Sequence, residues 1–445
     1  MAATNMTRGP IFRQLAGYAL PLIVGNCFQL GYNAVDAIIA GRFIGRDALA
    51  ATGTASPVMN LMILGISGIC MGAGVLMSEF FGAGKQEDLR KELSTSVLFG
   101  LFFSLTVAAL GVALTDPLMA LLHVPEGIRD ITGIYLRITF LGAPFTYFYN
   151  ALAQALKAVG DSKTPLKFLM FSSCLNAVLD LIFIGWLGFG IVCSATTTVI
   201  AEAVSAILSI VYVQRKVPML RLSAREWRID RGLLRQTLSY GSVTALQQAV
   251  QPICKLMIQG QVNTLGVDVM AAFNACTRVD DFAFTPEQSI AQAMTTFIAQ
   301  NRGAGQHQRI REGFRKGLLL ETGYWVLIGA AAMLFRQQIV GWFVTGEGSA
   351  EVIRLGAQYL GVMSLMYFLP AMTNGVQGFY RGMGFMSMTL LGTCIQAGMR
   401  VLFTYLLTPA LGILGIPLAS MIGWLLMLAV QVPYYFRYAR AKGLR

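Results

Sequence analysis

Apolar runs recur along the whole chain and are separated by short polar segments. A helix of about 20 apolar residues crosses the roughly 30 Å hydrocarbon core of a bilayer. The pattern therefore predicts twelve membrane-spanning helices, near residues 15–40, 50–79, 93–115, 133–156, 168–187, 191–213, 238–262, 280–300, 317–342, 355–380, 387–408 and 413–436. We expect an all-α polytopic membrane protein. The first run leads directly into a span, so no cleavable signal peptide is expected.

Composition supports a membrane protein and the distribution of charge orients it. The chain is 55% hydrophobic and 13% charged, whereas soluble domains carry about 25% charged residues. The net charge of +12 could indicate nucleic-acid binding, but most of the 34 lysines and arginines fall in alternate loops. This distribution follows the positive-inside rule and predicts that both termini are cytoplasmic. We expect a bacterial cytoplasmic membrane protein that contacts lipid and no nucleic acid.

No catalytic or metal-binding motif stands out. The seven cysteines lie in or beside apolar runs without CxxC spacing, which is typical of small buried hydrophobic residues. The two histidines, His123 and His307, fall in predicted loops on opposite sides of the membrane. No GxxxxGK[ST] motif is present, which disfavours an ATP-driven pump. We expect no enzyme activity and no cofactor.

The two halves of the chain resemble each other. "FIGRDALAA" (43–51) matches "TLGVDVMAA" (264–272), and the Gly-Ala-Gly of 82–84 matches that of 303–305 at the same separation. We therefore expect two six-helix lobes in the same orientation, 1–213 and 237–445, joined by a basic cytoplasmic linker, 214–236. Parallel repeats related by a pseudo-two-fold axis along the membrane normal are a transporter architecture, with substrate bound near the midplane.

Polar residues of the first span share one helical face. Gln29, Tyr32, Asn33 and Asp36 follow the spacing i, i+3, i+4, i+7, and such residues line a bundle interior or a wet cavity. Pro21 lies near the start of this span, where it removes a backbone hydrogen bond and permits a kink.

Three further polar residues of the first half could join Asp36. Asn176 and Asp180 are one turn apart in the fifth span, and Thr198 lies in a polar stripe of the sixth span with Glu202. Two carboxylates close together in a low dielectric disfavour ionisation of both, which suits carriage of a proton. Their hard oxygen atoms also suit a small cation such as Na⁺. Alternatively, each acid only hydrogen-bonds to its neighbours.

The candidate residues of the second half differ in charge. They lie in the seventh, eighth and eleventh spans and are Gln251, Lys255, Arg278, Asp280, Gln288 and Arg400. The repeat aligns Arg400 with Asn176 and Thr404 with Asp180, so paired acids are expected only in the first half. We therefore expect the first half to bind the coupling ion and the second half to contact the substrate.

The partner of Lys255 is left open by the sequence. A buried lysine needs an acidic partner such as Asp36 or Asp280, and otherwise favours an anionic or zwitterionic substrate over a cationic one. Arg278 and Asp281 are three residues apart and could pair with each other. Such a pair would be structural.

Six segments carry a resemblance to a known family. They read "YNAVDAIIAGRFIGRDALAATG", "FFGAGK", "GDSKTP", "LNAVLDLIFI", "SATTTV" and "TRVDDFAFTP". Together they cover both repeats and resemble the multidrug and toxic compound extrusion (MATE) family, in particular its bacterial DNA-damage-inducible-F-like branch. The resemblance implies two lobes around a central cavity and export of organic compounds in exchange for Na⁺ or H⁺. It also implies a cation site at Asp36, Asn176, Asp180 and Thr198 and a kink at Pro21.

The chain departs from the family pattern at two positions. Lys255 stands where a neutral polar or acidic side chain is expected, and Glu202 stands where the family commonly has glutamine. The charge of the substrate therefore stays open.

The expected function is secondary antiport of small organic or drug-like compounds against H⁺ or Na⁺ by alternating access, carried out by a monomer. A lipid-linked-sugar or lipid flippase of the same superfamily is the alternative. Lys255, Arg278 and Arg400 would supply the basic cavity that a flippase needs. A membrane-embedded enzyme is the least favoured function.

Overall fold

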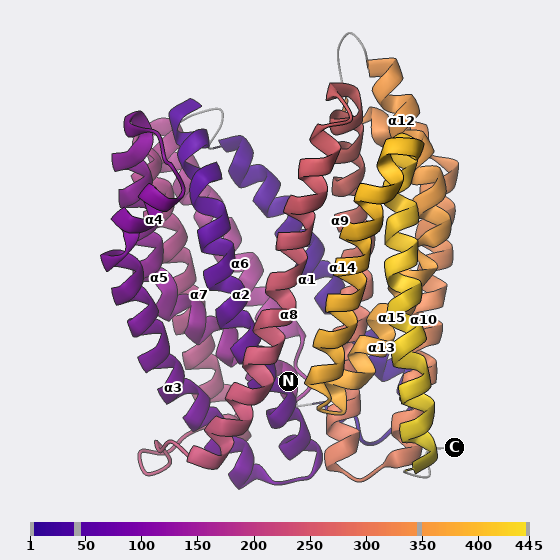
Figure 1. The fold of residues 1–445 in the computed structure, drawn as a ribbon. Helices are drawn as coiled ribbons and strands as arrows, with labels where there is room; N and C mark the ends of the chain where they lie inside the picture. The colour runs from indigo at the N-terminus through magenta and orange to yellow at the C-terminus, as the bar shows by residue number, and fades with distance from the viewer. Residues whose placement is uncertain (1–3, 40–45, 345–348, 442–445) are drawn as a thin grey trace. The chain divides into compact units, whose positions relative to one another are not determined.

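The computed structural model describes residues 4–39, 46–344 and 349–441, and these form helices joined by short loops (Figure 1). The chain divides into two compact units. Unit 1 comprises Met1–Asn5 and Val24–Ala245, and unit 2 comprises Met6–Ile23 and Leu246–Arg445. The predicted lobe limits at residues 213 and 237 stay a prediction.

Unit 1 contains the second part of α1 (Ile11–Ile39), the first part of α8 (Arg231–Asn263), and the elements between them. These are α2 (Arg46–Gly82), α3 (Gln86–Ala113), α4 (Thr115–Leu121), α5 (Glu126–Ala158), α6 (Lys163–Asp180), the π-helical turn η2 (Leu181–Trp186), α7 (Ile191–Lys216) and the 3₁₀ turn η3 (Pro218–Leu220). The centre of the unit is α5, which packs against α2, α3 and α7.

Unit 2 contains the first part of α1, the second part of α8, and all later elements. These are α9 (Val267–Gly303), α10 (His307–Leu334), α11 (Arg336–Gly341), α12 (Ser349–Met366), α13 (Phe368–Gly382), α14 (Met386–Leu411), the 3₁₀ turn η4 (Gly412–Leu414) and α15 (Gly415–Ala441). The central helix is α9, which packs against α10, α12 and α13. The start of α1 joins the same core, where Leu15 and Tyr18 pack with Phe297.

The twelve predicted spans correspond one for one to the long helices, with α6–η2 and α12–α13 each taken as one segment. Two predicted spans are interrupted. The span 317–342 is divided between α10 and α11, and the span 355–380 bends by 46° between α12 and α13.

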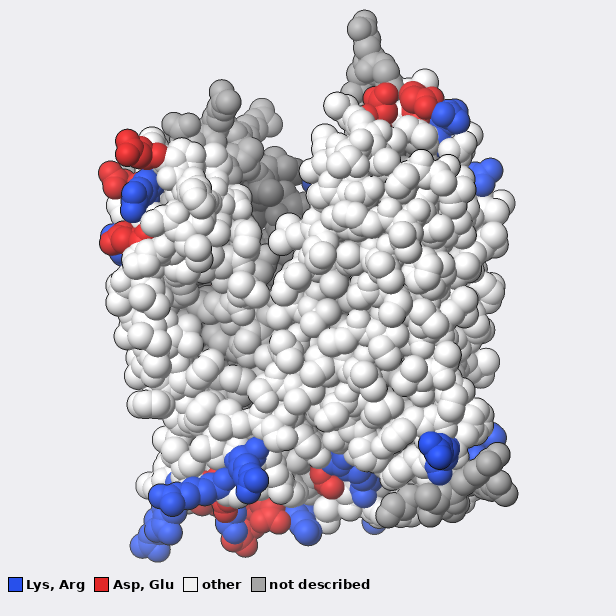
Figure 2. Space-filling model, viewed as in Figure 1, with Lys and Arg blue, Asp and Glu red and all other residues white. Residues whose placement is uncertain are grey.

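Length and composition alone identify only part of this set. In the described residues, six segments are long and apolar enough to cross a membrane, or up to seven if the bent pair α12–α13 is one span. Helices α8 and α9 are the least apolar of the long helices. Polar residues within spans concentrate where a helix lines a site rather than lipid. On the face drawn in Figure 2, the charged side chains of each unit gather at the helix ends and leave an uncharged band between them.

Glycines let α2 and α8 approach closely within unit 1. A Cβ atom added at Gly68 would lie 2.4 Å from the Cα of Ala245, and one at Gly72 would lie 2.5 Å from the backbone nitrogen of Gly241. Small residues at helix interfaces allow this backbone contact in membrane proteins.

Substitution of Gly72 by alanine is expected to destabilise unit 1 by about 1–3 kcal/mol, because the added methyl group meets backbone atoms that cannot turn away. Thermal unfolding of the purified protein measures the effect. Gly65→Ala is the control in the same helix, since nothing lies within 4 Å of a Cβ there. Equal melting temperatures for the two variants would contradict the close contact.

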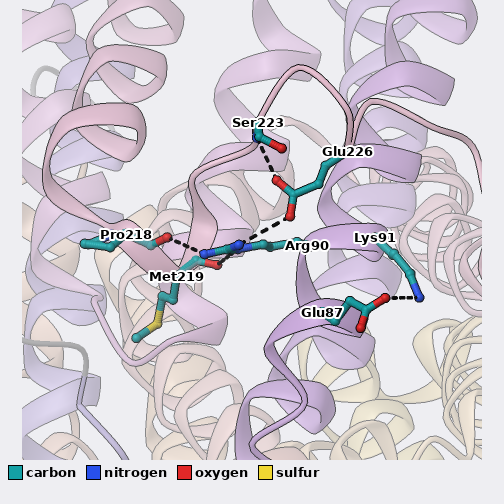
Figure 3. A network of polar contacts seen from close by, with 7 residues as sticks. All are labelled: Glu87, Arg90, Lys91, Pro218, Met219, Ser223 and Glu226. Carbon is teal, nitrogen blue, oxygen red and sulfur yellow. Dashed lines mark hydrogen bonds and ion pairs between the residues drawn. The ribbon is translucent and has the colours of Figure 1, made fainter.

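The basic linker is anchored on α3 by Arg90 (Figure 3). Its guanidinium donates to the carbonyl oxygens of Met219 at 3.2 Å and Pro218 at 3.0 Å, and pairs with Glu226 at 3.3 Å. The backbone N–H of Ser223 donates to Glu226 at 2.7 Å. Hydrogen bonding from Ser223, with a further contribution from Arg90, holds the pKa of Glu226 below its ordinary value. The linker is therefore an ordered part of unit 1.

Loss of this anchor is expected to expose the linker to protease. The Arg90→Ala substitution removes these contacts and is expected to lower the free energy of opening the linker by about 1.5 kcal/mol. This value is the lower end of the range for hydrogen bonds to charged groups, because the site is partly exposed. Since cleavage follows the population of the open form, tryptic cleavage at Arg221, Arg225 and Arg228 should become about tenfold faster.

The neighbouring residue supplies the control for this experiment. Among the described residues, the ion pairs of Lys91 are with its own helix, at 2.8 Å from Glu87 (Figure 3) and 3.9 Å from Asp88, and its electrostatic interaction with Asp230 of the linker is weaker than these. An exposed pair of this kind contributes roughly 0–1 kcal/mol, so Lys91→Ala should leave linker cleavage unchanged. Equal cleavage of the two variants would show that Arg90 does not hold the linker.

Candidate functional site

Two polar side chains are buried at the end of α6 in unit 1. Asn176 and Asp180 lie one helical turn apart and are each 1% exposed. Directly after Asp180 the α-helix changes into the π-helical turn η2. Such turns are frequent at functional sites.

Side chains from two other helices reach this pair. The hydroxyl of Thr197, on α7, donates to Asp180 Oδ1, and the hydroxyl of Tyr32, on α1, donates to Asn176 Oδ1. Three helices of unit 1 thus converge on one buried carboxyl and one buried amide. In the described residues Asn176 Nδ2 is buried without a hydrogen-bond acceptor. The arrangement can bind a proton or a small cation, since carboxyl, amide and hydroxyl oxygen atoms converge there and an ionisable side chain within a membrane-spanning segment marks an ion or proton pathway.

Thr197 is a contact that the sequence did not single out. Three consecutive threonines, 196–198, stand in the segment "SATTTV", and successive helical residues point in directions about 100° apart. The predicted ligand Thr198 instead donates to the backbone oxygen of Ser194 at 2.9 Å. The spacing alone could not choose among the three hydroxyls; the packing of α6 on α7 does.

Asp36 lies on α1 at a position whose side chain is outside the described part of the structure. Its predicted place beside Asp180 therefore stays a prediction. Among the other first-span candidates, Tyr32 reaches Asn176, while Gln29 donates to Asn33 at 3.2 Å on an exposed face. Pro21 lies inside α1.

Glu202 lies on α7 and accepts a hydrogen bond from Thr146 of α5 at 2.5 Å. It thus contacts a neighbouring helix of the same unit.

The acidic residues 280 and 281 of α9 point to different partners. Asp281 pairs with Lys255 of α8 at 2.8 Å, and both side chains are about half exposed. Asp280 is buried and accepts hydrogen bonds from the hydroxyls of Tyr359 at 2.9 Å and Tyr367 at 2.7 Å. Lys255 is therefore neutralised by Asp281 rather than by Asp280, and Asp281 is bound by Lys255 rather than by Arg278. Neither tyrosine was a sequence candidate, because both lie in an apolar run far from α9 in the chain.

The remaining candidates of unit 2 are divided between buried and exposed positions. Gln251 donates to Gln396 of α14 at 3.1 Å. Arg400 interacts electrostatically with Asp280, and its Nε is buried without an acceptor in the part of the chain described. Arg278 and Gln288 are exposed. Over the described ranges, no group of three or more His, Cys, Asp or Glu residues could hold a metal ion.

Comparison with known proteins supports a single family. The chain matches the MatE family model over residues 21–182 and 244–406, one segment in each half of the repeat. The probable multidrug resistance protein YpnP of Bacillus subtilis is 26% identical over 448 residues, which cover 100% of this chain and 99% of the relative. The FAD transporter of Shewanella oneidensis is 25% identical and covers 82% of this chain and 80% of its own length.

The fold agrees with that of solved transporters. A transporter of the MOP superfamily from Pyrococcus furiosus superposes with a TM-score of 0.91 at 22% identity, covering 100% of this chain and 99% of the other. At this identity the likeness shows the fold, and it confirms the prediction of an all-helical membrane protein with twelve spans. With the family model matched in both halves, this chain belongs to the MatE family, a family of membrane transporters and not of enzymes.

Proposed function

We propose that this protein is a secondary antiporter that exports small organic, drug-like compounds in exchange for H⁺ or Na⁺. The observation that carries the proposal is the buried carboxyl of Asp180, which accepts a hydrogen bond from Thr197 of α7 and lies in a segment otherwise apolar enough to cross a membrane. A buried acid in such a segment is costly and marks ion pathways or proton relays.

The coupling site in this proposal consists of Asp180 and Asn176, with Asp36 and Thr198 added from the sequence. Each inward positive charge supplies about 2.3 kcal/mol per 100 mV of membrane potential. Because Tyr32 donates to Asn176, the site is linked directly to α1. A change of charge at Asp180 would therefore alter the hydrogen bonds that attach α1 to α6, and alternating access would use that change to release substrate.

The relatives support export of organic compounds without defining their charge. One relative is named a probable multidrug resistance protein and another an FAD transporter. The same proposal includes three further points. The protein is a monomer in a bacterial cytoplasmic membrane, both of its termini are cytoplasmic, and it belongs to the DNA-damage-inducible-F-like branch of the family.

The flippase alternative is weakened by the pairing of Lys255. A flippase for pyrophosphate-linked lipids needs positive charge that no acid of the protein neutralises. Lys255, Arg278 and Arg400 would supply that charge, and Asp281 neutralises Lys255. The Arg278 side chain is exposed and could still bind a phosphate group, so lipid translocation is measured alongside dye transport.

Transport in proteoliposomes tests the proposal. Purified protein should move a charged dye when a pH or a Na⁺ gradient is imposed, and dye movement should drive the ion in the opposite direction. Gradients applied separately identify the ion. Dye movement that is indifferent to both gradients, or translocation of a fluorescent lipid in place of the dye, would contradict antiport.

A further inference from the structure

Two acidic side chains outside the proposed coupling site are fully buried in unit 2. Glu287 stands on α9 and Glu321 on α10, and each is 0% exposed. Both helices pack against α13. There, Asn374 Nδ2 lies 3.5 Å from Glu287 Oε2, and a Cβ atom added at the next residue, Gly375, would lie 3.8 Å from Glu321 Cγ. The two acids therefore lie against consecutive residues in the same turn of α13 and interact electrostatically with each other.

Most of the oxygen atoms of this pair have no donor. In the described residues, Glu287 Oε1 and both carboxyl oxygens of Glu321 are buried without a hydrogen-bond partner. None of the salt bridges recorded there involves either residue. Burying one unpaired carboxylate costs several kcal/mol. A second carboxylate nearby adds repulsion that a low dielectric leaves almost unscreened.

The neighbouring titratable groups do not supply the missing positive charge. Asp280 also interacts with Glu287 but is itself acidic. Its carboxylate accepts hydrogen bonds from the hydroxyl groups of Tyr359 and Tyr367. Tyr324 of α10 donates to the backbone oxygen of Ala283. Arg400 of α14 faces Asp280. The group is therefore rich in acids, and Arg400 acts on Asp280 rather than on the two glutamates as far as the described residues show.

We propose that Glu287 and Glu321 share one exchangeable proton and form a second proton-binding site, located in unit 2. One carboxylate takes up H⁺ and becomes a neutral carboxyl, whose O–H can donate to the remaining carboxylate. Asn374 positions Glu287 for this exchange. A proton needs only two oxygen atoms, whereas hard cations take about six or more oxygen ligands, which two carboxyls and one amide do not supply.

Two buried acids near each other in unit 2 were not expected from the sequence, which indicated paired acids only in the first half. The two glutamates lie on different helices, so no helical spacing connects them, and only the packing of α9 and α10 against α13 brings them together. The inference concerns proton binding within unit 2 and does not depend on whether Asp180 couples transport.

Infrared difference spectroscopy of the purified full-length protein tests the inference. The wild-type minus Glu321→Gln and the wild-type minus Glu287→Gln difference spectra at neutral pH are each expected to show the carbonyl band of the same single protonated carboxyl, which is lost in both variants. Glutamine keeps the shape of the side chain and removes the need for a proton. Glu351→Gln is the control, because Glu351 is an exposed acid of unit 2 paired with Arg354 at 2.6 Å; its spectrum should keep the band.

Three results would overturn the inference. An unchanged band in both variants would mean that neither glutamate holds a proton. Separate bands, one lost in each variant and both lost in the double variant, would mean that each carboxyl is protonated independently. Loss of the wild-type band when NaCl replaces KCl would assign the site to Na⁺. A melting curve confirms that each variant is folded, and the comparison of both single variants distinguishes a shared proton from two independent ones. Dye export is not measured, so failure here is distinct from failure of the antiport proposal.

Discussion

Asp180→Asn is expected to lower ion-coupled export by about 100-fold, near the upper end of the coupling between two sites on one protein. Asparagine has the shape of aspartate and can still accept the hydrogen bond from Thr197 through its Oδ1. It cannot bind a proton at neutral pH and offers no negative charge to a cation. The fold should persist, because the substitution removes a buried charge and leaves the packing of α6 unchanged. Gradient-driven dye export from proteoliposomes measures the effect.

The matching substitution in α1, Asp36→Asn, should have the same effect if the two acids form one site. Asp116→Asn is the control for both: Asp116 is an exposed acid of unit 1, paired with Arg137 at 2.8 Å, and its loss should leave export at the wild-type rate. Wild-type export by both Asp36→Asn and Asp180→Asn would place the coupling site elsewhere. Loss of export in only one of the two variants would show that Asp36 and Asp180 do not act as one site.

Lys255→Gln is expected to shift substrate preference toward cations by about tenfold, which corresponds to about 1.4 kcal/mol. The Lys255 ammonium group lies 2.8 Å from Asp281, and both side chains are about half exposed. Removing the ammonium group leaves the carboxylate of Asp281 uncompensated, so a cationic compound gains an attraction and an anionic one meets repulsion. Export of a cationic and an anionic dye of similar size, compared as a ratio, measures the shift.

Arg354→Gln is the matched control for this experiment. Arg354 pairs with Glu351 on α12 at similar exposure, so its substitution also removes one positive charge from unit 2. A shift that is as large in the control would reflect net charge rather than a position in the substrate path. An unchanged ratio in Lys255→Gln would show that the Lys255–Asp281 pair is structural.

Prediction of the fold succeeded because a bilayer constrains helices strongly. Each long apolar run must form a helix in order to satisfy its backbone hydrogen bonds within the hydrocarbon core. Even α8 and α9, the least apolar of the long helices, were predicted, since each contains an apolar run of about 20 residues. The interruption between α10 and α11 was missed, because no proline in the predicted span marks Phe335 as a break. The bend between α12 and α13 did have a signal in the sequence: Pro370 has no N–H to donate to the carbonyl of Met366, which permits a kink at Tyr367.

Two candidate site residues could be placed together from the sequence because one helix carries both. Asn176 and Asp180 are i, i+4 neighbours, so their shared face follows from helical geometry alone, and both are buried. The rotation of α7 against α6 determines that Thr197, and not Thr198, donates a hydrogen bond to Asp180. The partner of Lys255 likewise depends on which way two adjacent acids of α9 point.

The sequence by itself determined the helices, their number, the internal repeat and the polar face at the end of α6. Each of these follows from local spacing and from the cost of exposing polar groups to lipid. Only the tertiary structure decided the contacts between helices: Tyr32 with Asn176, Thr197 with Asp180, and Glu287 beside Glu321. A helical period specifies which residues share a face, but the rotation and register of one helix against another depend on packing along their whole length. The acids that a spacing rule connects were therefore found first, and the pair that packing brings together was found only in the structure.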